Sequence, residues 1–147
     1  MKKALLWFGG ISLFLVVIFA LSMTYAAYDK SKWNEVSSEH AKKIVNGFNE
    51  FNEEKFNNYW GGIKPGTPEQ RQMMINWASK FGTLVKIDSV DVFSYNSFVS
   101  FTGGGVTHFY VYDVKATYTN GPVIFRLWFK INKDRLDVMN MNINQGT

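Results

Sequence analysis

The stretch THFYVYDVKATY, residues 107–118, combines one histidine, one aspartate and three tyrosines within a dozen residues. A histidine oriented by a carboxylate can act as a general base. The apolar and β-branched residues between them are typical of a strand, in which successive side chains point to opposite faces. His108 and Asp113 then lie on opposite faces. We therefore expect no catalytic His–Asp pair within this strand.

The face that carries His108, Tyr110 and Tyr112 is the candidate wall of a ligand pocket between a sheet and its helices. A polar side chain there could serve as a base or an oxyanion donor. In the preceding strand Asp88 and Asp91 are expected on opposite faces, so one of them could join the pocket. A carboxyl buried there would have a raised pKa. The alternative is a buried histidine that is hydrogen-bonded to a tyrosine or to the backbone.

The opposite face of the same sheet is a candidate surface for a protein partner. Residues 122–132 alternate, which places Arg126 and Trp128 on this face together with Phe109. Exposed aromatic and arginine side chains are typical of protein interfaces. The alternative is a solvated face on which Arg126 lies near Asp113 or Lys115. The side chains expected in the core are Val123, Phe125, Leu127, Phe129 and Ile131.

Several kinds of chemistry are excluded by composition. The chain of 147 residues has no cysteine, so thiol catalysis, disulfides and cysteine-ligated metals are ruled out. His40 and His108 are too far apart in sequence to form a recognised metal motif, and no nucleophile elbow or phosphate-binding loop occurs. From residue 29 onward the charge is only 14 basic minus 12 acidic residues, or +2, which does not indicate nucleic-acid binding. We expect no metal, no cofactor and no catalytic residue.

The N-terminal segment 4–28 contains no charged residue and follows Lys2 and Lys3. This pattern predicts a transmembrane helix that acts as a signal anchor, with the N-terminus in the cytoplasm. A cleaved signal peptide or a buried core helix are the alternatives. We expect a single-pass protein of the cell membrane, in contact with the lipid bilayer. Gly9, Gly10 and Ser12 form a small-residue patch that another helix could approach.

Three regions follow from these patterns: an anchor at 1–28, a juxtamembrane spacer at 29–35, and an extracytoplasmic domain at 36–147. Within the domain we expect helices at 36–60 and 67–82, the second with a capping box at Thr67 and Gln70. The expected strands are 84–94, 97–102, 106–119, 122–132 and 135–144. The predicted fold class is α+β, with two helices on a curved antiparallel sheet of four to five strands behind one transmembrane helix.

This order of elements, with the passage NWASKFGTLVKIDSVDV at 76–92, resembles the nuclear-transport-factor-like (cystatin-like) superfamily of cone-shaped domains. The resemblance covers residues 36–144. It implies helices packed on a curved sheet, and the superfamily includes isomerases, dehydratases and assembly domains without catalytic activity. With an anchor in front, the architecture is similar to inner-membrane assembly factors of type IV secretion systems.

Three functions are compatible with the sequence. The first is a membrane-anchored, non-enzymatic domain outside the cytoplasm that binds or positions a protein partner in a membrane-associated assembly. The second is a small-molecule-binding or enzymatic cone with the pocket near His108. The third is an accessory subunit that acts mainly through its transmembrane helix. A pocket filled by Phe and Trp side chains would favour the first, and a deep pocket with Asp88 or Asp91 within hydrogen-bond reach of His108 or a tyrosine would favour the second.

Overall fold

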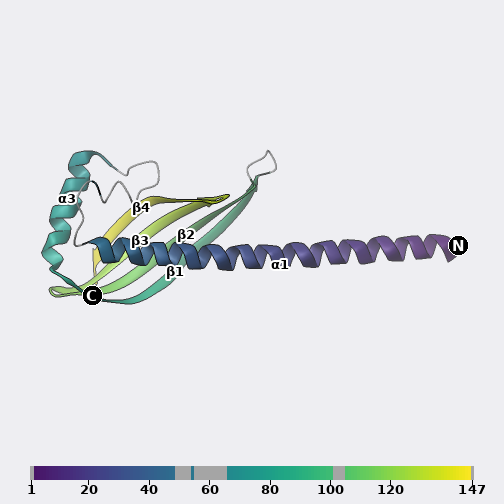
Figure 1. Ribbon diagram of the computed structural model, residues 1–147, viewed down its shortest axis with the longest axis horizontal. Helices are drawn as coiled ribbons and strands as arrows, with labels where there is room; N and C mark the ends of the chain where they lie inside the picture. The colour runs from purple at the N-terminus through teal and green to yellow at the C-terminus, as the bar shows by residue number, and fades with distance from the viewer. Residues whose placement is uncertain (1, 49–53, 55–65, 101–104, 147) are drawn as a thin grey trace. The chain divides into compact units, whose positions relative to one another are not determined.

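The computed structural model in Figure 1 describes residues 2–48, 54, 66–100 and 105–146. The chain divides into two units, Met1–Asn34 and Glu35–Thr147. Helix α1, Lys2–Gly47, begins in the first unit and ends in the second.

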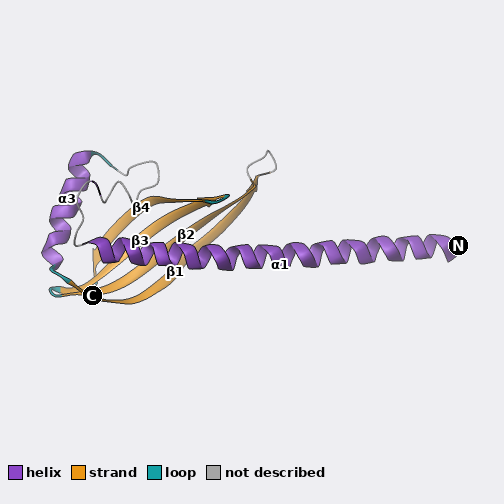
Figure 2. Cartoon of the chain, in the orientation of Figure 1, coloured by secondary structure: helices purple, strands orange, loops and turns teal. Residues whose placement is uncertain are grey.

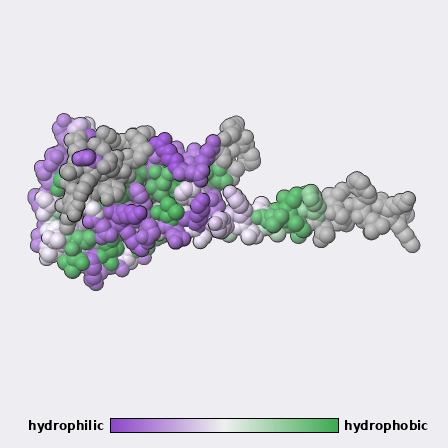
Figure 3. Space-filling view, in the orientation of Figure 1, coloured by the Kyte–Doolittle hydropathy of each residue, from purple (hydrophilic) through white to green (hydrophobic). Residues whose placement is uncertain are grey.

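The first unit is helical, and its described side chains from residue 14 to residue 28 are mostly apolar and exposed (Figure 3). The two hydroxyls at Ser22 and Thr24 bond to backbone carbonyls of the same helix, those of Phe19 and Ala20, at 2.8 and 2.9 Å. Large apolar residues that are exposed on this helix are Phe14, Leu15, Val16, Val17, Ile18, Phe19, Leu21, Met23, Tyr25 and Tyr28.

No helix in the part of the chain that the structure describes is long and apolar enough to cross a membrane. The predictions of a transmembrane signal anchor, of a single-pass protein and of a location in the cell membrane are therefore wrong on this finding.

The helices also differ from the predicted fold class. The structure has two α-helices in the described residues, α1 and α3, because the expected anchor, spacer and first domain helix are one continuous helix. The expected spacer 29–35 contains neither glycine nor proline, so nothing in it interrupts the helix. Most of the predicted helix beyond Phe48 lies outside the described residues.

Helix α3, Pro68–Ala78, begins as the sequence predicts. The Thr67 side chain accepts a hydrogen bond from the Gln70 backbone, and the Gln70 side chain accepts one from the Thr67 backbone. A short 3-10 helix, η2 (Ser79–Phe81), follows and leads into the sheet. The capping box is thus confirmed, while the regular α-helix ends before Gly82.

The sheet is a four-stranded antiparallel meander in the order β1-β2-β3-β4 (Figure 2). The predicted turns at 119–122 and 132–135 join β2 to β3 and β3 to β4. The predicted strands 84–94 and 97–102 are one strand, β1, because the chain absorbs a register shift between Val92 and Ser94 and continues pairing with β2. The strands are β1 (Leu84–Ser100), β2 (Gly105–Tyr118), β3 (Gly121–Asn132) and β4 (Arg135–Gln145).

The core of the second unit lies between one face of the sheet and the last turns of α1 (Figures 1 and 2). Ala41, Ile44 and Val45 of the helix are fully buried, and the Phe48 ring packs edge-on against Phe125 at 4.9 Å between centroids. We call this the inner face and the opposite side of the sheet the outer face. The inner-face residues of β3 are the five that alternation predicts: Val123, Phe125, Leu127, Phe129 and Ile131.

Candidate functional site

The inner-face residues predicted to line a pocket form a packed row of rings. His108 is only 4% exposed, and its Nδ1 lies 3.1 Å from the Tyr95 hydroxyl. The Tyr95 ring is 4.7 Å from Tyr110 and 6.1 Å from His108, measured between centroids. Tyr110 and Tyr112 are stacked at 5.8 Å with planes 11° apart. His108, Tyr110 and Tyr112 are therefore buried against one another and against Tyr95.

Tyr112 connects this row to helix α1. Its hydroxyl shares a buried hydrogen bond of 2.7 Å with the Ser37 hydroxyl. Burial raises the pKa of Tyr112 to about 12, although the bond to Ser37 acts in the opposite direction. Burial likewise raises the pKa of Tyr118 to about 12. Both phenols are therefore neutral near pH 7: Tyr112 packs and hydrogen-bonds, and Tyr118 packs in the core, so neither acts as a base.

Neither predicted carboxylate joins the histidine. Asp88 accepts a hydrogen bond from the Thr117 hydroxyl at 2.7 Å and lies 2.7 Å from the Lys86 ammonium. The hydrogen bond from Lys86, followed by the one from Thr117, lowers the pKa of Asp88. A register shift between Ile87 and Ser89 allows the Asp88 carboxylate to reach the outer face, where strict alternation had separated it from Asp91.

Asp91 lies on the same outer face. It accepts a hydrogen bond from the Ser89 hydroxyl at 2.8 Å and pairs with the Lys115 ammonium at 3.1 Å. The bond from Ser89 is the main cause of its lowered pKa, and Lys115 is the next. A general base that works near neutral pH needs the opposite shift. The structure thus brings His108, Tyr110 and Tyr112 together and leaves Asp88 and Asp91 on the other side of the sheet.

The outer face carries the three predicted partner-surface residues, Phe109, Arg126 and Trp128, all half-exposed. Arg126 donates to both carboxylate oxygens of Asp113, each bond 2.7 Å long, and the two residues are directly opposed in register. The Arg126 guanidinium carbon also lies 3.6 Å from the centroid of the Phe93 ring. The ion pair and the ring hold this arginine in one position on the outer face.

Two further aromatic residues belong to this surface and were missed by the sequence analysis. Phe93 is 58% exposed, and Phe98 is 63% exposed with its ring edge-on to Phe109 at 5.8 Å. We define the outer aromatic surface as Phe93, Phe98, Phe109, Arg126 and Trp128. Each register shift in β1 changes which residues share a face, so alternation counted from Leu84 no longer assigns side chains to the correct face. The faces of Phe93 and Phe98 could therefore not be assigned from spacing.

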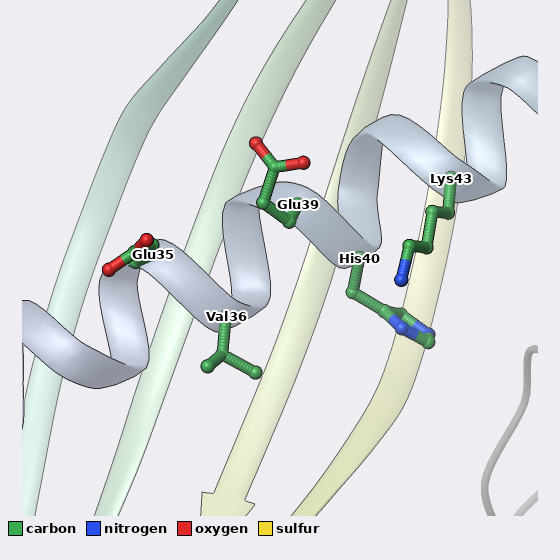
Figure 4. Close-up of a pocket in the computed structure, with 5 residues that line it drawn as sticks. All are labelled: Glu35, Val36, Glu39, His40 and Lys43. Carbon is green, nitrogen blue, oxygen red and sulfur yellow. The ribbon is translucent and has the colours of Figure 1, made fainter.

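A shallow hollow of about 320 Å³ lies along helix α1 within the second unit (Figure 4). Its His40 ring packs edge-on against Phe129 at 6.0 Å between centroids, and Glu39 is paired with Lys42 at 2.6 Å. Among the residues that the structure describes, no group of three or more His, Cys, Asp or Glu side chains could hold a metal ion. The residues that line the hollow are Glu35, Val36, Glu39, His40 and Lys43.

The predicted small-residue patch at Gly9, Gly10 and Ser12 lies in helix α1, but its side-chain surroundings are outside the described residues.

Comparison of the chain with protein-family models, with curated proteins and with solved structures finds no match.

Proposed function

We propose that the second unit, Glu35–Thr147, is a non-enzymatic module that binds a protein partner on its outer aromatic surface. The observation that carries the proposal is the stack of Arg126 on the exposed Phe93 ring, on the same sheet face as the Phe98–Phe109 pair. Arginine and aromatic side chains supply a large share of the binding energy in protein interfaces. Asp113 fixes the arginine before any partner arrives, which reduces the entropy lost on binding.

The contrast with the inner face supports this proposal over a ligand-binding or catalytic cone. His108, Tyr110 and Tyr112 are buried and packed against one another or against Tyr95. Their hydrogen bonds to Tyr95 and Ser37 occupy polar atoms that a substrate would otherwise contact. A pocket at this position would need these rings to separate.

Charges on the outer face point to an apolar rather than a charged partner surface. Lys86 pairs with Asp88, Lys115 with Asp91, and Arg126 with Asp113. These pairs neutralise one another, so the face has no excess of either sign among them. Affinity should consequently depend on aromatic contact area and only weakly on ionic strength.

The test is loss of partner binding when an outer aromatic side chain is removed. The full chain would be used to capture its partner, the partner would be identified and purified, and the dissociation constant would be measured with the wild type and with Trp128→Ala. We expect Trp128→Ala to weaken binding by about 5- to 30-fold, equivalent to ~1–2 kcal/mol. Trp77→Ala, which removes an exposed tryptophan from α3, is the matched control and should bind as the wild type does.

The resemblance to cystatin-like cone domains remains a prediction and agrees with a non-catalytic assembly role. The proposal concerns only the second unit, Glu35–Thr147, because the prediction of a membrane anchor was wrong. An equal loss of binding in Trp77→Ala and Trp128→Ala would contradict it, as would full binding by Trp128→Ala.

A further inference from the structure

The two halves of strand β1 differ in regularity and in charge. All three register shifts along the β1–β2 ladder occur between Leu84 and Ser94. From Ser94 to Ser100 the pairing with β2 is uninterrupted, ending with Ser100 opposite Gly105. The first half also contains Lys86, Asp88 and Asp91, whereas the second half, SYNSFVS, contains no charge, no proline and no glycine.

This difference matters because β1 is an edge strand. In the part of the chain that the structure describes, its only strand neighbour is β2. Proteins protect free edges with bulges, charged side chains or proline, since unpaired backbone groups otherwise pair with another strand. The first half of β1 has two of these protections, and the segment Ser94–Ser100, which we call the open edge, has none.

We propose that two copies of this chain pair through their open edges, as antiparallel strands about a two-fold axis at Ser97. Ser97 then lies opposite Ser97 of the second copy, and Asn96 lies opposite Phe98. This register keeps outer-face residues on one side of the joined sheet, as strand alternation requires. The two four-stranded sheets become one continuous antiparallel sheet. The same patch serves both copies, as an isologous dimer requires.

The side chains of the open edge suit this pairing. It brings no like charges together, because the open edge is uncharged. Each Phe98 lies diagonally across the new ladder from Phe98 of the second copy, at a spacing of roughly 7–8 Å that aromatic rings can bridge. Each Phe98 already packs on its own Phe109, so the dimer would bring two existing ring pairs together at the margin of the outer aromatic surface and leave Phe93, Arg126 and Trp128 accessible.

The inference does not rest on the proposed function, since its occupant is a second copy and its contact is the edge of β1. A single introduced cysteine tests the register directly, because the chain has none of its own. Residues directly opposed across antiparallel strands have Cβ atoms about 4.5–5.5 Å apart, close to disulfide distance. The full chain would be kept in a non-ionic detergent, because the apolar side chains of α1 are exposed.

Under mild oxidation the Ser97→Cys variant should give a disulfide-linked dimer, and a reducing agent should convert it back to the monomer. Val85→Cys is the matched control: Val85 is exposed on the same strand, outside the open edge. It should remain a monomer on a non-reducing gel. Equal crosslinking of the two variants, or none of Ser97→Cys, would overturn the proposal.

A second pair of variants tests the same contact without a covalent bond. Ser97→Lys places two positive charges directly opposite each other and should weaken dimerisation at least tenfold in sedimentation equilibrium. Val85→Lys adds the same charge outside the contact and should dimerise like the wild type. Circular dichroism would confirm that both variants remain folded. A wild type that is monomeric, or a folded Ser97→Lys variant that dimerises normally, would also overturn the proposal.

Discussion

Leu127 illustrates how much a single side chain of the inner face contributes. It lies in the middle of β3, and its side chain is fully buried on the inner face of the sheet. Leu127→Ala should lower the free energy of unfolding by about 2–5 kcal/mol, since it removes buried methyl groups and leaves a cavity. Chemical denaturation would measure this loss. Ile124→Ala, on the outer face of the same strand, is the control and should cost much less. A loss below about 0.5 kcal/mol for Leu127→Ala would show that the faces are reversed.

The buried phenols predict how stability depends on alkaline pH. The pKa values of Tyr112 and Tyr118 are raised from 10 to about 12 by burial, so the folded state holds these protons more tightly than the unfolded state does. Their contribution to stability is therefore complete below about pH 10 and is lost as the pH rises toward 12. Urea unfolding at pH 8 and pH 11 would measure the decline.

Tyr118→Phe should lose less stability than the wild type between these two pH values, because one buried phenol no longer ionises on unfolding. Tyr28→Phe is the control, since Tyr28 is exposed on α1. It should decline as the wild type does. A Tyr118→Phe variant with the wild-type decline would mean that ionisation of this phenol does not contribute.

At the level of residues, alternation predicted which side chains of β2 and β3 share the inner face, and it placed Arg126 near Asp113 or Lys115, of which Asp113 is its partner. It did not predict that Asp88 and Asp91 both bond on the outer face. A register shift depends on how two strands meet, which the spacing within one strand does not contain.

Among the elements, the junction of η2 and β1 depends on Gly82. Its φ is +81°, and an added Cβ would collide with the Thr119 hydroxyl. That hydroxyl accepts a hydrogen bond of 3.0 Å from the Thr83 backbone and thus ties the junction to the β2–β3 turn. Gly82→Ala should destabilise the protein by about 1–3 kcal/mol through backbone strain and this clash.

Gly121→Ala provides the comparison. Gly121 has a φ of +132°, but an added Cβ would meet no atom within 4 Å among the described residues. The Gly121→Ala variant should therefore lose only the stability that the positive φ costs, without a steric clash. Thermal unfolding of the two variants would reveal the difference. A Gly82→Ala variant that is no less stable than Gly121→Ala would refute the role of the Thr119 contact.

The elements were predictable where local signals are strong and unpredictable where continuity decides. The capping box at Thr67 and the two tight turns identified the start of α3 and the ends of β3. Residues 29–35, predicted as a spacer, are part of helix α1, and the predicted gap between two strands near residue 95 is absent from β1. In both places the chain has no strong breaker, and helix or sheet pairing simply continues.

At the level of the whole molecule, the length of the uncharged segment did not correctly predict a membrane-spanning helix. The segment 4–28 predicted a membrane span, yet no helix of the described residues meets the requirements for one. The second unit is characterised by the difference between the two faces of its sheet. One is filled by Tyr110, Tyr112 and their neighbours, and the other carries exposed rings around Arg126.

The central claim is that the outer face binds and the inner face only packs. The most direct measurement compares the dissociation constants of His108→Gln and Trp128→Ala for the captured partner, each variant first shown to be folded. We predict that His108→Gln binds within about twofold of the wild type and that Trp128→Ala binds about 5- to 30-fold more weakly. A folded His108→Gln variant that fails to bind, beside a Trp128→Ala variant that binds normally, would contradict the account and assign function to the inner row of rings.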